Sequence, residues 1–257
     1  MIFESHAHFD DKAFDEDRDI LLASMKEKGI EYIINVSAEY DSIDATHELT
    51  KKYDFIYGTV GIHPSDIAEL NLDKFEIMKK KAMRDKIVAI GEIGLDYYWD
   101  KEEAVQQKQR EWFVKQLDLA REVNKPIIVH SRDAAADTMD ILKSDVAKDI
   151  PGVIHCYSYS LEQAKIYAKM GYYFGIGGVV TFSNAKKLVE TVEYLPLEQI
   201  LLETDSPYLA PVPNRGKRNS SLNLPYIAEK IAQIKNVSYD TVVEVTAENA
   251  KRLFFGI

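Results

Sequence analysis

Eight short runs rich in Val, Ile and Tyr recur along the chain, with longer helical patterns between them. The runs span residues 2–8, 31–37, 55–62, 87–93, 126–130, 152–157, 172–177 and 200–205, and consecutive starts lie 20 to 40 residues apart. That spacing leaves room for a helix and two loops after each run, which predicts βα units and a parallel sheet. Eight units in 257 residues predict a (β/α)₈ TIM barrel of parallel strands, with the active site at its C-terminal face.

Two segments between or after these runs have a clear helical pattern. Residues 107–123 place Trp112, Phe113 and Leu117 among interleaved charges, and residues 224–234 repeat apolar side chains at spacings of three and four. No linker or low-complexity tract interrupts the series, so we expect a single domain, residues 1–257. A doubly wound open sheet is the competing architecture. It requires a glycine-rich turn after the first strand, where this chain has His-Ala-His-Phe-Asp at 6–10.

Composition excludes several classes of protein. With 46% hydrophobic and 29% charged residues the chain is expected to be globular, and its apolar runs, about seven residues long, fall far short of the ~18 that span a bilayer. An acidic N-terminus without an apolar signal region, together with the single cysteine Cys156, leads us to expect a cytoplasmic location. The net charge of −10 argues against a general nucleic-acid coat and leaves local basic patches open.

Five of the six histidines stand at the C-terminal ends of predicted strands: His6, His8, His63, His130 and His155. In a barrel these ends meet around one opening, where barrel enzymes build their active sites. His6 and His8 are two residues apart, so the side-chain period of a strand places both on one face as a two-imidazole metal clamp. His63 is balanced between a contact with substrate and a structural role.

Two carboxylates complete this predicted cluster. Glu92 interrupts an otherwise apolar run, where burying an unpartnered carboxylate is costly, and Asp205 ends the last run. Together with the histidines they exceed what one metal needs, which predicts two divalent ions about 4 Å apart with Glu92 bridging them. Nitrogen-rich ligation favours Zn, Mn, Fe or Co, with Mg as the less preferred ion. Glu203 is either a deeper ligand or, as we favour, an acceptor that orients a histidine, and Cys156 is expected to face the surrounding helices.

Cations and aromatic residues suggest how a substrate is held. Arg215, Lys217 and Arg218 follow the eighth predicted strand, where barrels often bind phosphate, and Arg132 lies two residues beyond His130. With His63, these four residues are our candidates for substrate binding. Residues 97–99, Tyr-Tyr-Trp, follow Glu92 and either stack on a base or pack as a lid.

These motifs, taken together and in order, resemble the TatD-related deoxyribonuclease family of the amidohydrolase-like metal-dependent hydrolases. The resemblance runs almost end to end and rests on SHAHFD at 5–10, GIHP at 61–64, GEIGLDYY at 91–98, PIIVHSR at 126–132, HCYS at 155–158, ETDSPY at 203–208 and RGKRN at 215–219. One departure is visible, since the family usually begins its first motif with Asp and this chain has Glu4.

The resemblance implies a barrel with two divalent metals. It implies that one metal is held by His6, His8, Glu92 and Asp205, and that the other is held by Glu92, His130 and His155. It also implies metal-dependent cleavage of DNA, often exonucleolytic.

We therefore expect a metal-dependent hydrolase that acts on phosphodiester bonds, a deoxyribonuclease with exonuclease activity. Glu92 and Asp205 are the expected catalytic residues, with Asp205 accepting a proton from the attacking water.

DNA is the expected partner, bound through local contacts, and no membrane partner is expected. The oligomeric state is left open, with a monomer as a plausible state. The alternatives are an amidohydrolase acting on a small cyclic amide, lactone or ester, and a non-catalytic metal-binding protein. Related amidohydrolases often carry a carboxylated lysine at the place of Glu92, which favours the nuclease.

Overall fold

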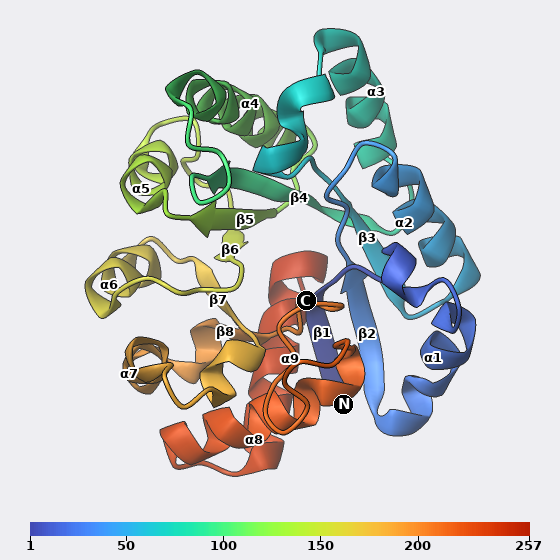
Figure 1. Ribbon diagram of the computed structural model, residues 1–257, viewed down its shortest axis with the longest axis vertical. Coiled ribbons are helices and arrows are strands. Elements are labelled where there is room, and N and C mark those ends of the chain that lie inside the picture. Colours follow the sequence, from blue (N-terminus) through green and yellow to red (C-terminus); the bar gives the residue numbers. More distant parts are fainter. The chain divides into compact units, whose positions relative to one another are not determined.

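Parallel strands alternate with helices along the chain, as the sequence predicts (Figure 1). The computed structural model describes residues 1–257. These residues form two compact units, of which unit 1 comprises Met1–Asn35 and Cys156–Ile257 and unit 2 comprises Val36–His155.

Unit 1 contains four strands and five α-helices. In this unit β1 pairs in parallel with β2, β7 pairs in parallel with β8, and a parallel bridge joins Ala7 to Ser206 just beyond β8. The helix α9 packs against β1 and β8. The elements are β1 (Ile2–Ala7), α1 (Arg18–Ser24), β2 (Ile30–Asn35), α6 (Leu161–Lys169), β7 (Tyr173–Ile176), α7 (Lys186–Tyr194), β8 (Ile200–Leu202), α8 (Leu224–Lys235) and α9 (Tyr239–Phe255).

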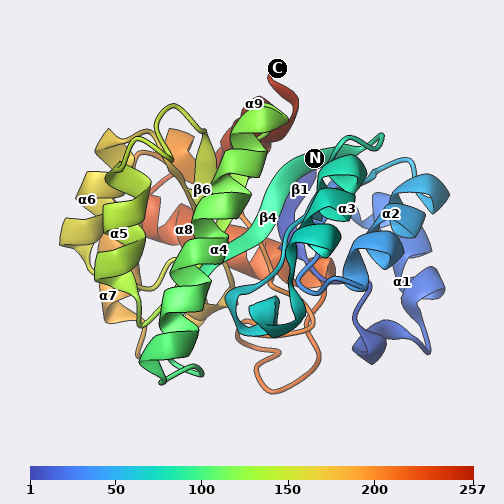
Figure 2. The same cartoon turned by 90° about the horizontal axis from the view of Figure 1, so that it is seen from above.

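Unit 2 contains the other four strands, β3 to β6, paired in parallel in chain order. Its longest helix, α4, runs along β4 (Figure 2). The elements are α2 (Ser42–Lys52), β3 (Ile56–Val60), α3 (Leu72–Ala82), β4 (Ile87–Asp96), α4 (Glu103–Glu122), β5 (Ile127–Arg132), α5 (Ala135–Lys143) and β6 (Gly152–Ile154).

Both helices predicted from apolar spacing are present. The helix α4 begins four residues before the predicted segment and buries Trp112, Phe113 and Leu117, as expected. The helix α8 buries Leu224, Ile227 and Ile231. It ends at Lys235, because the left-handed backbone of the next residue, Asn236 (φ 53°), stops the helix. None of the helices combines the length and apolar character that a membrane crossing requires.

Two strands stop three residues before their predicted ends. We expected strands over 152–157 and 200–205, but β6 ends at Ile154 and β8 ends at Leu202. His155 and Asp205 therefore lie in the turns that follow. The backbone explains the difference, because Cys156 (φ 45°) and Asp205 (φ 56°) adopt the left-handed conformation, which is incompatible with an extended strand.

Candidate metal centre

The end of β1 and the turn after β8 bring two imidazoles and a carboxylate together in unit 1. The Nε2 atoms of His6 and His8 are 3.1 Å apart, and Asp205 Oδ1 lies 3.8 Å from the first and 3.5 Å from the second. His6 is fully buried and His8 nearly so. Backbone bonds hold the cluster, since His8 N–H donates to Ser206 O and Asp205 N–H donates to His6 O. The structure thus places these three predicted residues side by side.

This arrangement fits a shared metal ion. The ligand atoms of His6, His8 and Asp205 all lie within 4.8 Å of one another. Two imidazole nitrogens 3.1 Å apart, each about 2.1 Å from an ion, subtend about 95° at that ion, which is an ordinary angle for such ligands. The clamp predicted from the two-residue spacing has the geometry that ligation requires.

Glu4, to which sequence reasoning assigned no role, anchors this cluster. Its fully buried carboxylate accepts hydrogen bonds from the N–H (2.8 Å) and Oγ1 (2.6 Å) of Thr204, from Ser221 Oγ (2.8 Å) and from the N–H of His6 (3.2 Å). Burial raises the pKa of Glu4 to about 8, although these hydrogen bonds oppose the shift. Glu4 thereby fixes the backbone of His6 and of the residue before Asp205. The only sequence signal for this role of Glu4 was that the resembled family usually has an acidic residue, Asp, at the start of its first motif.

In unit 2 three imidazoles surround a single oxygen of Glu92. Its Oε1 lies 2.8 Å from His130 Nδ1, 3.4 Å from His155 Nε2 and 4.0 Å from His63 Nε2. Glu92 is 3% exposed and sits in the apolar strand β4. The ligand atoms of His63, Glu92 and His130 form a second group compact enough to hold a metal ion. A buried carboxylate among imidazoles is a donor set suited to divalent transition metals.

Asp96, which the sequence analysis did not single out, orients His130. The Oδ2 of Asp96 lies 3.1 Å from His130 Nε2, while Nδ1 of the same ring faces Glu92. Burial opposes a charge on His130, but hydrogen bonding to Asp96 and Glu92 outweighs it and raises the pKa of His130. A carboxylate behind a ligating histidine fixes the ring's tautomer and direction. The sequence signal that could have identified Asp96 was its position at the end of β4, within the GEIGLDYY motif.

Two buried glutamines of α4 hold the ends of the strands that carry this cluster. Gln109 accepts from the N–H of Asp96 (2.9 Å) and donates to the carbonyl of the same residue (3.2 Å). Gln116, two helical turns later, accepts from the N–H of Ile62 (2.8 Å) and donates to its carbonyl (3.2 Å). The adjacent His63 accepts from Ser65 N–H through Nδ1, so one side of its ring is structural while Nε2 faces Glu92.

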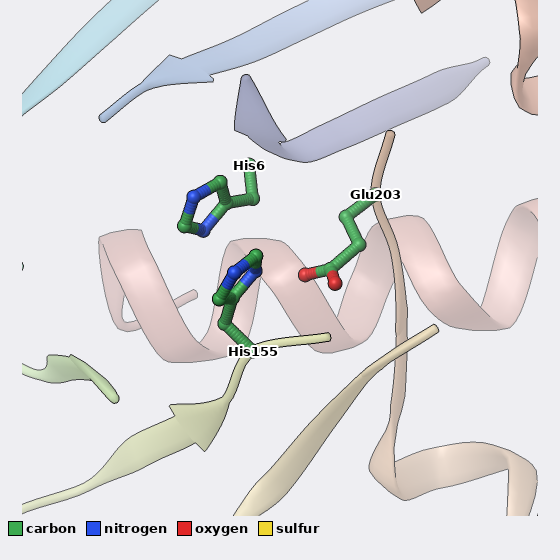
Figure 3. Close-up of side chains that lie close together, drawn as sticks. All are labelled: His6, His155 and Glu203. Carbon is green, nitrogen blue, oxygen red and sulfur yellow. The ribbon is translucent and has the colours of Figure 1, made fainter. Parts of the chain in front are cut away.

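Glu203 supports the turn that carries His155. Its Oε1 accepts from the N–H of Cys156 (2.6 Å), the residue bonded to His155. Figure 3 shows the Glu203 side chain extending from the segment that follows β8, with its carboxylate on the side of the His6 ring of the same unit. Cys156 does not follow the expected alternation: its Sγ lies within 4.8 Å of an Asp205 oxygen. The left-handed backbone of Cys156 reverses the direction that a continued strand would impose.

The four predicted substrate-binding cations have different surroundings. Arg132 lies over Tyr98, with its guanidinium carbon 3.8 Å from the ring centroid, and Arg215 lies over Phe182 at 4.3 Å. Lys217 is exposed. Arg218 forms a bidentate pair with Asp17, at 2.8 and 2.6 Å.

Comparisons with known proteins agree with the fold and with a metal-dependent hydrolase. A family model described as TatD related DNase matches residues 3–255. An uncharacterized metal-dependent hydrolase of Bacillus subtilis, YabD, is 41% identical over 99% of both chains. Another of Escherichia coli, YcfH, is 36% identical over 99% of this chain and 96% of its own. The crystal structure of YjjV, a TatD homolog from Escherichia coli, has a TM-score of 0.91 at 27% identity and covers 99% of this chain and 98% of its own. This likeness confirms the predicted (β/α)₈ TIM-barrel fold.

Proposed function

Since the chain belongs to the TatD-related DNase family of metal-dependent hydrolases, we propose that it hydrolyses phosphodiester bonds in DNA as an exonuclease. The observation that carries the proposal is the surrounding of Glu92, one of whose oxygens lies within 4.0 Å of three imidazole nitrogens. A carboxylate with a purely structural role pairs with a cation or accepts a few hydrogen bonds. A carboxylate oxygen surrounded by imidazoles at the ends of parallel strands is instead suited to metal-assisted hydrolysis.

The proposed centre holds two divalent ions. One is assigned to His6, His8, Glu92 and Asp205, and the other to Glu92, His130 and His155, as the family resemblance implies. The close approach of the ligand atoms within each unit supports the assignment. Imidazole-rich ligation favours Zn, Mn, Fe or Co over Mg.

When bound, the ions supply Lewis acidity to the phosphate and make a water nucleophilic near neutral pH. The protein's own residues then handle protons and position. Asp205, whose side chain is 17% exposed, accepts the proton of the attacking water. Glu203 keeps His155 in place by holding the N–H of Cys156. Asp96 keeps the His130 ring turned toward Glu92.

Phosphate binding is assigned to cationic and imidazole groups. Arg132, Arg215 and Lys217 present positive charge, and His63 directs Nε2 toward Glu92. We assign Arg218 an indirect part, because its pairing with Asp17 shapes the loop that carries Arg215 and Lys217. A cytoplasmic location stays a prediction of the sequence, and the oligomeric state stays open.

The test is cleavage of end-labelled DNA by metal-stripped protein that is reloaded separately with Zn, Mn, Co and Mg. We expect reloading to restore cleavage, and we expect Asp205→Asn to lower kcat by about 10²–10⁴-fold, the usual contribution of general acid–base catalysis. Metal content is measured on both proteins, so that loss of an ion is distinguished from loss of the base.

Two outcomes would overturn the proposal. Reloaded protein that binds two ions and leaves DNA intact, yet hydrolyses small cyclic amides, lactones or esters, would establish the amidohydrolase alternative. Protein that binds metal and turns over neither class would be a binding protein.

A further inference from the structure

Two exposed aromatic side chains follow β4 in unit 2. Trp99 is 67% exposed and Tyr98 is 42% exposed, and their rings meet edge to face with centroids 4.7 Å apart. The preceding Tyr97 differs, because its hydroxyl donates to Asp137 (2.6 Å) and accepts from Arg110 (2.9 Å). Hydrogen bonds within the protein thus hold the Tyr97 side chain in place, while the two aromatic rings that follow it are exposed to solvent.

A cation lies against this exposed pair. The guanidinium carbon of Arg132 is 3.8 Å from the Tyr98 centroid and 5.4 Å from the Trp99 centroid. Pairing of β4 with β5 sets Arg132 opposite Asp96, and the N–H of Tyr97 donates to Arg132 O (2.8 Å). The backbone of the aromatic turn is therefore tied to the strand that carries Arg132. The guanidinium itself makes no hydrogen bond or ion pair within the chain, so its donors remain available to an anion.

One carboxylate connects these residues to the candidate metal centre. Asp96 Oδ1 accepts from the N–H groups of Tyr98 (2.9 Å) and Trp99 (3.1 Å), while Oδ2 of the same residue lies 3.1 Å from His130 Nε2. Arg132 is two residues beyond His130 on β5. The backbone of the two exposed aromatic residues and the ring of His130 are thus held by the two oxygens of a single buried side chain.

We propose that Tyr98, Trp99 and Arg132, here called the aromatic platform, form a subsite that stacks one nucleobase while Arg132 contacts an adjoining phosphate. The proposal rests on the proposed nuclease function and names the residues that hold the substrate beside the metal centre. An indole face stacks on any base, and a guanidinium over an aromatic ring presents its donors in one plane. A lid that only packs on the protein would bury these rings, whereas here both are exposed.

Stacking is tested first by binding, independently of cleavage. The chain has two tryptophans, and the other, Trp112, is 7% exposed in α4. Trp112→Phe therefore leaves Trp99 as the sole indole reporter in the full-length, metal-loaded protein. We expect a phosphorothioate-linked oligothymidylate to quench this fluorescence, and an abasic phosphorothioate chain of equal length to leave it nearly unchanged. Equal quenching by both, or by neither, would overturn base stacking on Trp99.

The second test is kinetic. Loss of one stacked base weakens binding by about 5- to 150-fold, so Trp99→Ala and Tyr98→Ala should each raise KM for DNA within that range at unchanged metal content. The matched control is Tyr194→Ala, since Tyr194 is 48% exposed and also lies beside a cation, with Lys165 Nζ 5.4 Å from its centroid. The control should leave KM unaltered. Unchanged KM in both platform variants would count against the subsite.

The two proposals fail separately. If DNA is cut normally by Trp99→Ala and Tyr98→Ala, the nuclease function stands and the aromatic platform is wrong. If wild-type protein leaves DNA intact but the oligothymidylate still quenches Trp99, a base-binding subsite stands and the reaction must be sought elsewhere.

Discussion

At the scale of the residue, the candidate centre is organised by single carboxylates, each of which accepts hydrogen bonds from several groups. Glu4 accepts hydrogen bonds both from the backbone of His6 and from Thr204, which lies 200 positions from Glu4 in the sequence. Asp96 joins His130 to the turn of the aromatic platform. A buried carboxylate is costly unless its oxygens accept hydrogen bonds, and each of these carboxylates meets that requirement with groups that belong to different elements. The same hydrogen bonds that lower the cost of burial also fix the candidate metal ligands.

Asp66 is a carboxylate whose surroundings oppose its charge. Burial, together with the charges of Glu39, Asp100 and Glu92, raises the pKa of Asp66 to about 6. Since the unfolded value is near 3.9, the folded state binds the proton more tightly. This stabilising effect is complete below about pH 4 and is lost as the pH rises through about 6.

We therefore expect Asp66→Asn to raise the free energy of unfolding at pH 7.5 by about 1 kcal/mol, and by progressively less as the pH falls toward 4.5. A two-unit shift corresponds to about 3 kcal/mol, and we discount it because the Asp66 side chain is 42% exposed. Urea unfolding followed by circular dichroism gives the measurement. The control is Asp140→Asn, an exposed position on α5. A stability gain that grows toward low pH would contradict the assignment.

At the scale of the element, α4 acts as a clamp on the loops of the site. Gln109 and Gln116 are seven residues apart, which places both on the helix face toward β4, and each holds one backbone N–H and one carbonyl. The apolar side chains of α4 bury the helix, while these two amides set the register of the strand ends. A pattern of apolar spacing predicts the first property and says nothing of the second.

The pairing of β4 with β5 depends on Gly94. Its φ is +145°, and a Cβ at this position would lie 1.9 Å from His130 O. We expect Gly94→Ala to lower the free energy of unfolding by about 3 kcal/mol, since it adds a steric clash of 1–3 kcal/mol to the backbone strain. It should also weaken metal binding, because His130 shifts.

Gly171→Ala is the matched control. Gly171 also has a positive φ (+86°) but has no atom within 4 Å of its ideal Cβ, so this substitution carries only backbone strain of about 1–2 kcal/mol. Urea unfolding and metal content are measured for both variants. Equal losses of stability would show that the close approach to His130 O is relieved at little cost.

For the whole molecule, the formal charge of −10 means that the proposed DNA substrate is held against a repulsive background. Attraction is confined to a few groups, of which Arg132, Arg215 and Lys217 are the proposed phosphate contacts. Release of counterions contributes a slope of about −0.7 per contacted phosphate of a single strand. We expect the logarithm of the association constant to fall with the logarithm of salt concentration with a slope of about −2.

Fluorescence anisotropy of a labelled phosphorothioate oligothymidylate, over a range of KCl concentrations, measures this slope. Lys217→Ala should reduce its magnitude by about 0.7, while Lys80→Ala, at an exposed position on α3, should leave it unaltered. A slope near −5 or steeper in the wild type would indicate a broad electrostatic surface in place of local contacts.

The sequence by itself determined the alternation of strands and helices, the barrel class and the residues that crowd the strand ends. These follow from local periodicity and from polar residues placed in apolar runs, and both are properties of neighbouring positions. Only the tertiary structure decided which partners Glu4, Asp96 and Gln116 hold, because their hydrogen bonds join residues 200, 34 and 54 positions apart. The direction of Cys156 and the pairing of Arg218 with Asp17 were decided in the same way, by a left-handed backbone and by a contact across 201 positions. Such contacts depend on how distant segments pack, which no local pattern records.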